Sequence, residues 1–120
     1  MGMIQNTASA NIANGAALSA AVCLGDKILC AIQMPAAWTA ADLTFQVSYD
    51  KGVTWTDLHD DGGTEVKISS PAAGEVRLLD PSGFASCMFL KVRSGVSATP
   101  VNQGAARTIT LVTRKFFPRS

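Results

Sequence analysis

The sequence predicts an all-β protein, an antiparallel β-sandwich of the jelly-roll type with eight or nine short strands. Apolar and polar residues alternate in short runs, which is typical of strands that bury one face. Glycine, proline, asparagine and aspartate separate these runs where turns are needed. Residues 36–42 leave room for a single helical turn, and no longer helix is predicted. The 120 residues suffice for one domain whose core needs no disulfide bonds.

The two ends of the chain differ in charge. Residues 1–25 contain no charged side chain, whereas four of the ten lysines and arginines follow residue 106. The formal net charge of +1 gives no strong field to attract nucleic acid. No stretch is apolar enough to span a bilayer, and the uncharged N-terminal segment does not resemble a secretory signal. We therefore expect a soluble protein with an N-terminal arm or edge strand (1–14), a β-sandwich domain (15–115) and a C-terminal tail (116–120).

The first part of the domain combines clear turns with short strands. Asn14-Gly15 is a strong hairpin signal, so we predict a turn there and a strand over residues 16–24. A helix over the alanine-rich part of that stretch competes, but the flanking glycines and the lack of charged residues weigh against it. After a turn at 25–27, the apolar run 28–34 is predicted to be a buried strand that Pro35 ends.

The clearest element is a β-hairpin over residues 43–58. Its first strand presents four apolar residues on one face: Leu43, Phe45, Val47 and Tyr49. The turn follows at Asp50-Lys51-Gly52, because aspartate accepts hydrogen bonds from nearby amides and glycine adopts positive φ without steric cost. Residues 53–56 are predicted to return as the second strand.

Four more strands are predicted after this hairpin. We place them over 64–68, 75–79, 87–93 and 107–114. The loops between them contain glycine or proline, and Asp80-Pro81-Ser82-Gly83 is the clearest of these turns. No segment is repeated, so a solenoid or propeller is not expected.

Three cysteines do not make a complete set of intramolecular disulfides. If Asp26-Lys27 is the two-residue turn of a hairpin, Cys23 and Cys30 face each other on neighbouring strands and could bond when oxidised. The alternative is that they stay reduced and act as small apolar residues, as in a reducing cytoplasm.

The hairpin turn matches the pattern S-x-D-x-G-x-T-W. The matching residues are Ser48, Asp50, Gly52, Thr54 and Trp55. This resembles the Asp-box of sialidases and related propellers, in which the aspartate ties the turn, the tryptophan packs beneath it and neither is catalytic. The match covers eight residues and occurs once in this chain, so we interpret it as a structural hairpin.

No pattern predicts a catalytic or metal site. Asp57, Glu65 and the run His59-Asp60-Asp61 could offer ligands to a cation, but their spacing does not match a calcium loop, and we interpret them as a solvated acidic turn. His59 is the only histidine, and no serine or cysteine has a recognisable nucleophile context. We therefore predict no enzyme activity and no cofactor.

A nucleic-acid surface is the less favoured interpretation of one strand face. Phe89, Lys91 and Arg93 share that face and could bind single-stranded nucleic acid by stacking and charge. The near-neutral net charge and the scarcity of other aromatics favour a polar outer face or a subunit contact.

Several segments of the chain share the pattern of one group of proteins. They are Gln33–Trp38, Thr54–Leu58, Asp60–Glu65, Phe89–Gly95 and Ala106–Val112. Together they resemble small accessory proteins encoded among the virion genes of tailed bacteriophages. The resemblance implies a non-enzymatic β-sandwich that attaches to a capsid or tail as a symmetric oligomer.

We accordingly expect a capsid-decoration or head-stabilising protein that is made in the host cytoplasm and located in the virion. Its expected partners are the major capsid protein or another virion protein, and further copies of the chain, with a trimer favoured; nucleic acid and membranes are not expected. An uncharged N-terminal segment can lie along a partner or pair with its sheet edge. The candidate partner-binding residues are Ile4, Asn6, Asn11, Ile12 and Trp38.

Trp38 leaves two interpretations open. An aromatic side chain in a loop beside apolar strands usually packs, so we expect Trp38 to cap an open end of the core. The alternative function is a receptor- or glycan-binding module of a phage fibre or tail, in which Trp38 and the acidic loop form a shallow sugar site. A hydrolase related to sialidases, dependent on His59, is a third hypothesis.

Overall fold

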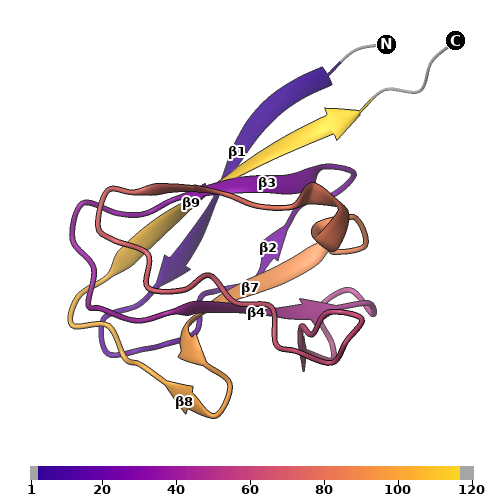
Figure 1. Ribbon diagram of the computed structural model, residues 1–120. Coiled ribbons are helices and arrows are strands. Elements are labelled where there is room, and N and C mark those ends of the chain that lie inside the picture. Colours follow the sequence, from indigo (N-terminus) through magenta and orange to yellow (C-terminus); the bar gives the residue numbers. More distant parts are fainter. Residues whose placement is uncertain (1–2, 117–120) are drawn as a thin grey trace, which may run out of the picture.

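The structure, a computed structural model, describes residues 3–116, with the side chains of 6–115. This part of the chain forms nine strands and one short 3₁₀ helix (Figure 1). They are β1 (Met3–Ile12), β2 (Val22–Cys23), β3 (Ile28–Gln33), β4 (Leu43–Ser48), β5 (Thr56–Asp57), β6 (Val76–Leu78), η1 (Pro81–Phe84), β7 (Phe89–Val96), β8 (Thr99–Pro100) and β9 (Arg107–Phe116).

The strands form two antiparallel sheets. The four-stranded sheet has the order β1-β9-β3-β6, and the five-stranded sheet has the order β2-β7-β4-β5, with β8 added to β7. Four pairs join the first four strands, one each, to strands later in the chain: β1 with β9, β2 with β7, β3 with β6 and β4 with β5. Two further pairs, β3 with β9 and β4 with β7, complete the sheets. The chain therefore folds like one long hairpin that is rolled into two sheets, which is the jelly-roll arrangement. The predicted fold class is confirmed.

The core lies between the two sheets. Phe45 on β4, Leu111 on β9 and Ile32 on β3 are fully buried, and Phe84 of η1 closes one end of the core against Phe45. The two phenylalanine rings meet edge to face, with centroids 5.2 Å apart and an interplanar angle of 77°. Alternate residues of β4, Leu43, Phe45 and Val47, thus supply the core, as the apolar alternation in the sequence predicts.

Several predicted elements have different limits in the structure. Residues 16–24 form only the two-residue β2 and one bridge at Leu18, and 64–68 make isolated bridges in place of a strand. The return strand of the central hairpin is β5, which overlaps the predicted strand 53–56 only at Thr56, and Val53 is 82% exposed. Residues 36–42 contain no helical turn. In each case loop hydrogen bonds to neighbouring segments replace the regular ladder.

The N-terminal segment is an edge strand and not a detachable arm. β1 pairs with β9 along its full length, from Met3 opposite Phe116 to Ile12 opposite Arg107. Ile12 and Ala10 are buried in the core. In Figure 1, β1 and β9 run side by side past the other strands toward the chain ends, and this ribbon gives the described chain its long dimension of 49 Å. The last four residues of the predicted tail, 117–120, lie outside the described residues.

The hairpin that would have placed Cys23 opposite Cys30 does not form. Cys23 lies on β2 opposite Phe89, whereas Cys30 lies on β3 in the other sheet, where it sits at an irregularity in the pairing with β9. The turn at Gly25-Asp26 therefore crosses between sheets and does not close a hairpin. Both cysteines and the buried Cys87 are free thiols. Burial raises the pKa of the Cys87 thiol.

The turn between β7 and β8 depends on a glycine. Gly95 has a φ of +90°, and a Cβ placed there would lie 2.6 Å from the Thr99 carbonyl oxygen and 2.7 Å from the Val101 nitrogen. Both neighbours are backbone atoms, so a side chain could be accommodated only by moving the strand pair. We expect Gly95→Ala to lower the free energy of unfolding by at least about 2 kcal/mol in urea denaturation.

The matched control is Gly83→Ala in η1, where no atom lies within 4 Å of the position that a Cβ would take and φ is not in the left-handed region. This variant should unfold close to the wild-type midpoint. Equal effects at the two glycines would contradict the explanation by steric conflict at Gly95.

Candidate functional site

The β4–β5 hairpin is held by hydrogen bonds among the residues of the S-x-D-x-G-x-T-W pattern. The Thr54 amide donates to Asp50 Oδ1 at 2.8 Å, and the Ser48 hydroxyl donates to the same oxygen at 2.7 Å. The Gly52 amide donates to Ser48 Oγ at 2.8 Å, and the Trp55 indole donates to the Gly52 carbonyl at 3.0 Å. The Thr54 amide, followed by the Ser48 hydroxyl, lowers the pKa of Asp50 to about 2. Every donor and acceptor of the motif serves the turn itself.

Two aromatic residues of this hairpin lie less deep than the sequence predicts. Tyr49 is expected on the apolar face but is 71% exposed, with its hydroxyl 3.1 Å from Ser86 Oγ. Trp55 is only partly buried and lies outside the core cluster. The Lys91 ammonium lies 4.6 Å from the centre of its ring, a cation–π contact. The tryptophan therefore covers the turn rather than filling the core.

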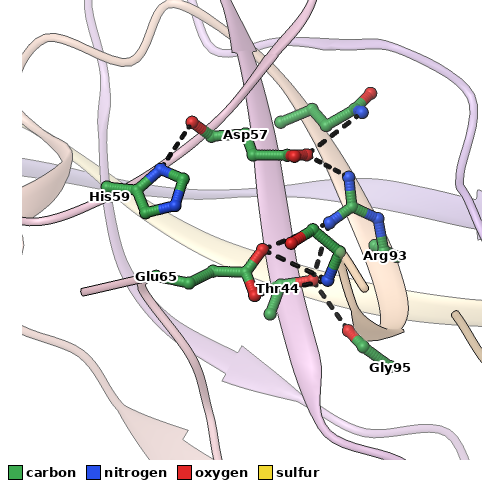
Figure 2. A network of polar contacts seen from close by, with 8 residues as sticks. Thr44, Asp57, His59, Glu65, Arg93 and Gly95 are labelled. Carbon is green, nitrogen blue, oxygen red and sulfur yellow. Dashed lines mark hydrogen bonds and ion pairs between the residues drawn. The ribbon is translucent and has the colours of Figure 1, made fainter. Parts of the chain in front are cut away.

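The most concentrated set of charges surrounds Arg93 on β7 (Figure 2). Arg93 is 6% exposed, and its Nη2 donates to Asp57 Oδ1 while its Nη1 lies 3.3 Å from Glu65 Oε2. The same Nη1 donates to the Thr44 hydroxyl at 3.3 Å, and that hydroxyl donates to the Gly95 carbonyl at 2.7 Å. Figure 2 shows both carboxylates directed at the guanidinium. Because Arg93 is buried, it belongs neither to an exposed basic surface nor to the polar outer face that the sequence favoured.

The acidic residues near Arg93 are already engaged. The Arg93 guanidinium, through its hydrogen bond, lowers the pKa of Asp57. Glu65 also accepts from the Ser97 amide at 3.2 Å, and His59 Nδ1 lies 3.3 Å from the Asp57 carbonyl oxygen. Within residues 3–116, no three histidine, cysteine, aspartate or glutamate side chains are grouped so as to hold a metal ion. The arrangement joins β4, β5, β7 and the loop of Glu65, and both carboxylates are engaged within it.

Sequence reasoning missed a buried glutamine. Gln103 is 1% exposed, and its side-chain amide donates to the Thr39 carbonyl at 3.0 Å and to Ser94 Oγ at 2.7 Å. Its Oε1 accepts from the Thr39 amide at 2.9 Å and from Arg107 Nε at 3.1 Å. A single glutamine in a loop carries no sequence signal, because its role depends on three segments that meet only in the fold.

The candidate partner-binding residues do not form one surface. Ile12 is 1% exposed and belongs to the core, so its assignment as a binding residue is wrong. Trp38 packs against the core cluster and its indole lies 3.4 Å from the Ala41 carbonyl, as a core cap would. Asn6 and Asn11 are exposed on β1, and Asn11 Oδ1 accepts from the Thr108 hydroxyl at 2.8 Å. The side chain of Ile4 lies outside the described residues.

A depression of about 550 Å³ lies between residues 40–42, residues 70–72 and the β7–β8 turn. Its one charged lining residue is Asp42, whose Oδ1 accepts from the Ser70 amide at 2.8 Å. The Lys67 ammonium lies 3.9 Å from the other oxygen. The one charged group of the depression is therefore already paired.

Comparison with protein-family models, with curated proteins and with solved structures finds no match to this chain. Among residues 3–116, no helix is long and apolar enough to cross a membrane.

The described surface has one further feature that could act on another molecule, the outer edge of β1. β1 is the first strand in the order β1-β9-β3-β6, and no strand within residues 3–116 pairs with its other side. The strand is ten residues long and carries no charged residue and no proline. Natural proteins usually protect such edges with charges, prolines or short length.

Alanine substitutions of Phe45 and Trp55 should distinguish a residue of the core from one that covers the turn. Phe45→Ala should lower the free energy of unfolding by about 3–5 kcal/mol, because Phe45 is fully buried. Trp55→Ala should cost roughly 1–2 kcal/mol, because the variant loses a partly buried ring, its hydrogen bond to the Gly52 carbonyl and one cation–π contact. Urea denaturation of both variants tests this. A Trp55→Ala loss as large as that of Phe45→Ala would place Trp55 in the core.

Removing the Arg93 charge should destabilise the fold and change its acid sensitivity. We expect Arg93→Met to cost about 2–4 kcal/mol at neutral pH, below the value for a fully buried pair because the carboxylates are partly exposed. The pKa of Asp57 is lower in the folded protein than in the unfolded chain. The stability that this carboxylate contributes is therefore fully present above the ordinary aspartate pKa of about 4, and it is lost as the pH falls through the lower pKa of the folded state. Arg93→Met should therefore lose less stability than wild type between neutral and acid pH.

The control is Arg77→Met, because Arg77 pairs with Glu75 at 2.8 Å in an exposed setting. Its effect should stay below about 1 kcal/mol in the same urea titrations. A similar loss in both variants would contradict the role of burial at Arg93.

Proposed function

We propose that this chain is a non-enzymatic structural protein of a virion, a capsid-decoration or head-stabilising protein that binds the particle surface as an oligomer. The proposal combines the sequence resemblance to virion accessory proteins of tailed bacteriophages with the free edge of β1. Its partners are the major capsid protein or another virion protein, together with further copies of the chain.

The free edge of β1 is the observation that carries the proposal. The other strands that end a sheet path are short: β6 has three residues, while β2 and β5 have two each. β1 has ten residues and lacks the charges that discourage strand addition. An exposed edge of this length can add a strand from another chain through main-chain hydrogen bonds, which suits an assembly protein.

The polar clusters of the described chain support a structural role over catalysis. Asp57 and Glu65 both receive hydrogen bonds from Arg93, Asp50 holds its own turn, and Gln103 is saturated by its neighbours. A general base or nucleophile needs a group that is free to exchange a proton with a substrate. The alternative of a glycan-binding fibre module has less support, because Trp38 packs against the core and lies half-buried.

The proposal is tested on particles. Virions from the strain that carries the gene should be purified on a density gradient and analysed by quantitative mass spectrometry. We expect the chain to remain with the particles in a fixed ratio to the major capsid protein. Recovery of the chain only in the soluble fraction, with none in the particle band, would contradict the proposed function.

A further inference from the structure

The backbone groups on the free edge of β1 can be assigned from one hydrogen bond. The Asn11 carbonyl accepts from the Ala20 amide at 3.0 Å, so Asn11 points its backbone away from β9. Residues two apart in a strand point their backbone groups to the same side, and the pairing of β1 with β9 has no irregularity. The residues that also point outward are Met3, Gln5, Thr7 and Ser9.

This stretch is accessible to another strand. Ala20 occupies the edge at Asn11, and nothing within residues 3–116 pairs with the outer edge over 3–9. β3 pairs with β9 only as far as Arg114, so the ends of β1 and β9 extend beyond the neighbouring strand (Figure 1). An incoming strand can lie beside residues 3–9, because no strand within residues 3–116 is paired on that side of β1.

We propose that this edge pairs with β1 of a second copy, in antiparallel orientation, and that the two four-stranded sheets become one continuous eight-stranded sheet. The second copy would be the partner of the same β1 edge that the proposed function uses, so the dimer rests on that function. The charge pattern favours a second copy, because residues 1–25 have no charged side chain and two such strands meet without repulsion. A two-fold axis then relates the copies, since each strand presents the same edge to the other.

The outward residues also define the register. Placing the axis at Asn6 sets Met3 opposite Ser9 and Gln5 opposite Thr7 of the second copy, so all four outward residues of each chain are paired. This gives about eight backbone hydrogen bonds, two for each hydrogen-bonded pair. Centring the axis on Thr7 would bring Met3 opposite Asn11, whose carbonyl is already occupied. The Asn6 register therefore uses the free edge most fully.

The first experiment removes one outward amide. Thr7→Pro deletes an N–H that faces the second copy, and proline is tolerated on an edge strand where the N–H does not bond inward. Thr7→Val is the control, because it keeps the amide and suits a strand. In sedimentation velocity over a range of concentrations, wild type and Thr7→Val should form dimers, whereas Thr7→Pro should stay monomeric with wild-type circular dichroism.

The second experiment tests the register and needs no backbone change. Asn6 is exposed, and the axis sets it opposite Asn6 of the second copy, with Cβ atoms about 4.5–5.5 Å apart. Asn6→Lys alone and Asn6→Glu alone should each weaken the dimer by about fivefold at low salt, and mixing the two variants should restore it as a heterodimer. Ser9→Lys is the control, because its lysine would face Met3 and not another lysine.

Each result supports or overturns the inference. A wild-type protein that is monomeric throughout, or that forms trimers, would overturn it, as would a Thr7→Pro dimer or mixed Asn6 variants without preferential pairing. If Thr7→Pro fails to fold, the mixed Asn6 variants decide. The dimer is measured on purified protein without particles, so a monomeric result would not contradict the proposed attachment to particles. A protein that forms the β1 dimer but is absent from virions would contradict the proposed function alone.

Discussion

The fold depends on the pairing of its two ends. β1 and β9 are joined in register over ten residue pairs, and they bring together residues about one hundred positions apart in the chain. Contacts of such long range form only after a large entropy loss for closing the loop, so the pairing must be extensive and well packed. Ala10, Ile12, Ile109 and Leu111 provide that packing on the core side. Without this closure, β9 would have no partner on one side and would become the edge of a three-stranded sheet.

The opposite end of the rolled chain is closed by the β4–β5 hairpin. Asp50 fixes its turn locally, and Arg93 then ties β4, β5 and the following loop to β7 through Thr44, Asp57 and Glu65. β5 has only two residues, so ladder hydrogen bonds alone would hold it weakly. The ion pairs of Arg93 fix the position of β5. They lie on the face of the sheet opposite the core. The Asp50 turn and the Arg93 ion pairs therefore serve to hold one end of the scaffold.

The sequence revealed the parts of this structure that depend on local pattern. The alternation around Phe45, the Asp50 turn and the jelly-roll class were predicted because side-chain period and turn chemistry are local properties. The sequence could not decide whether Cys23 lies opposite Cys30, because a turn looks the same whether it closes a hairpin or crosses between sheets. The buried positions of Arg93 and Gln103 could not be predicted, since both depend on loops that come together only after the strands are paired.

The topology also explains why the free edge lies on β1. A rolled hairpin has two sheets and therefore several edges, and the other strands that end a sheet path, β2, β5 and β6, have only two or three residues. The strand that closes the roll is long, because it pairs with β9 over all ten of its residues. A long closing strand leaves an equally long outer edge. Its lack of charge is then not required by the monomer, whose solvent-facing side would tolerate lysine or glutamate at Asn6 or Thr7. That uncharged edge is the one feature of β1 that folding leaves unexplained and association would explain.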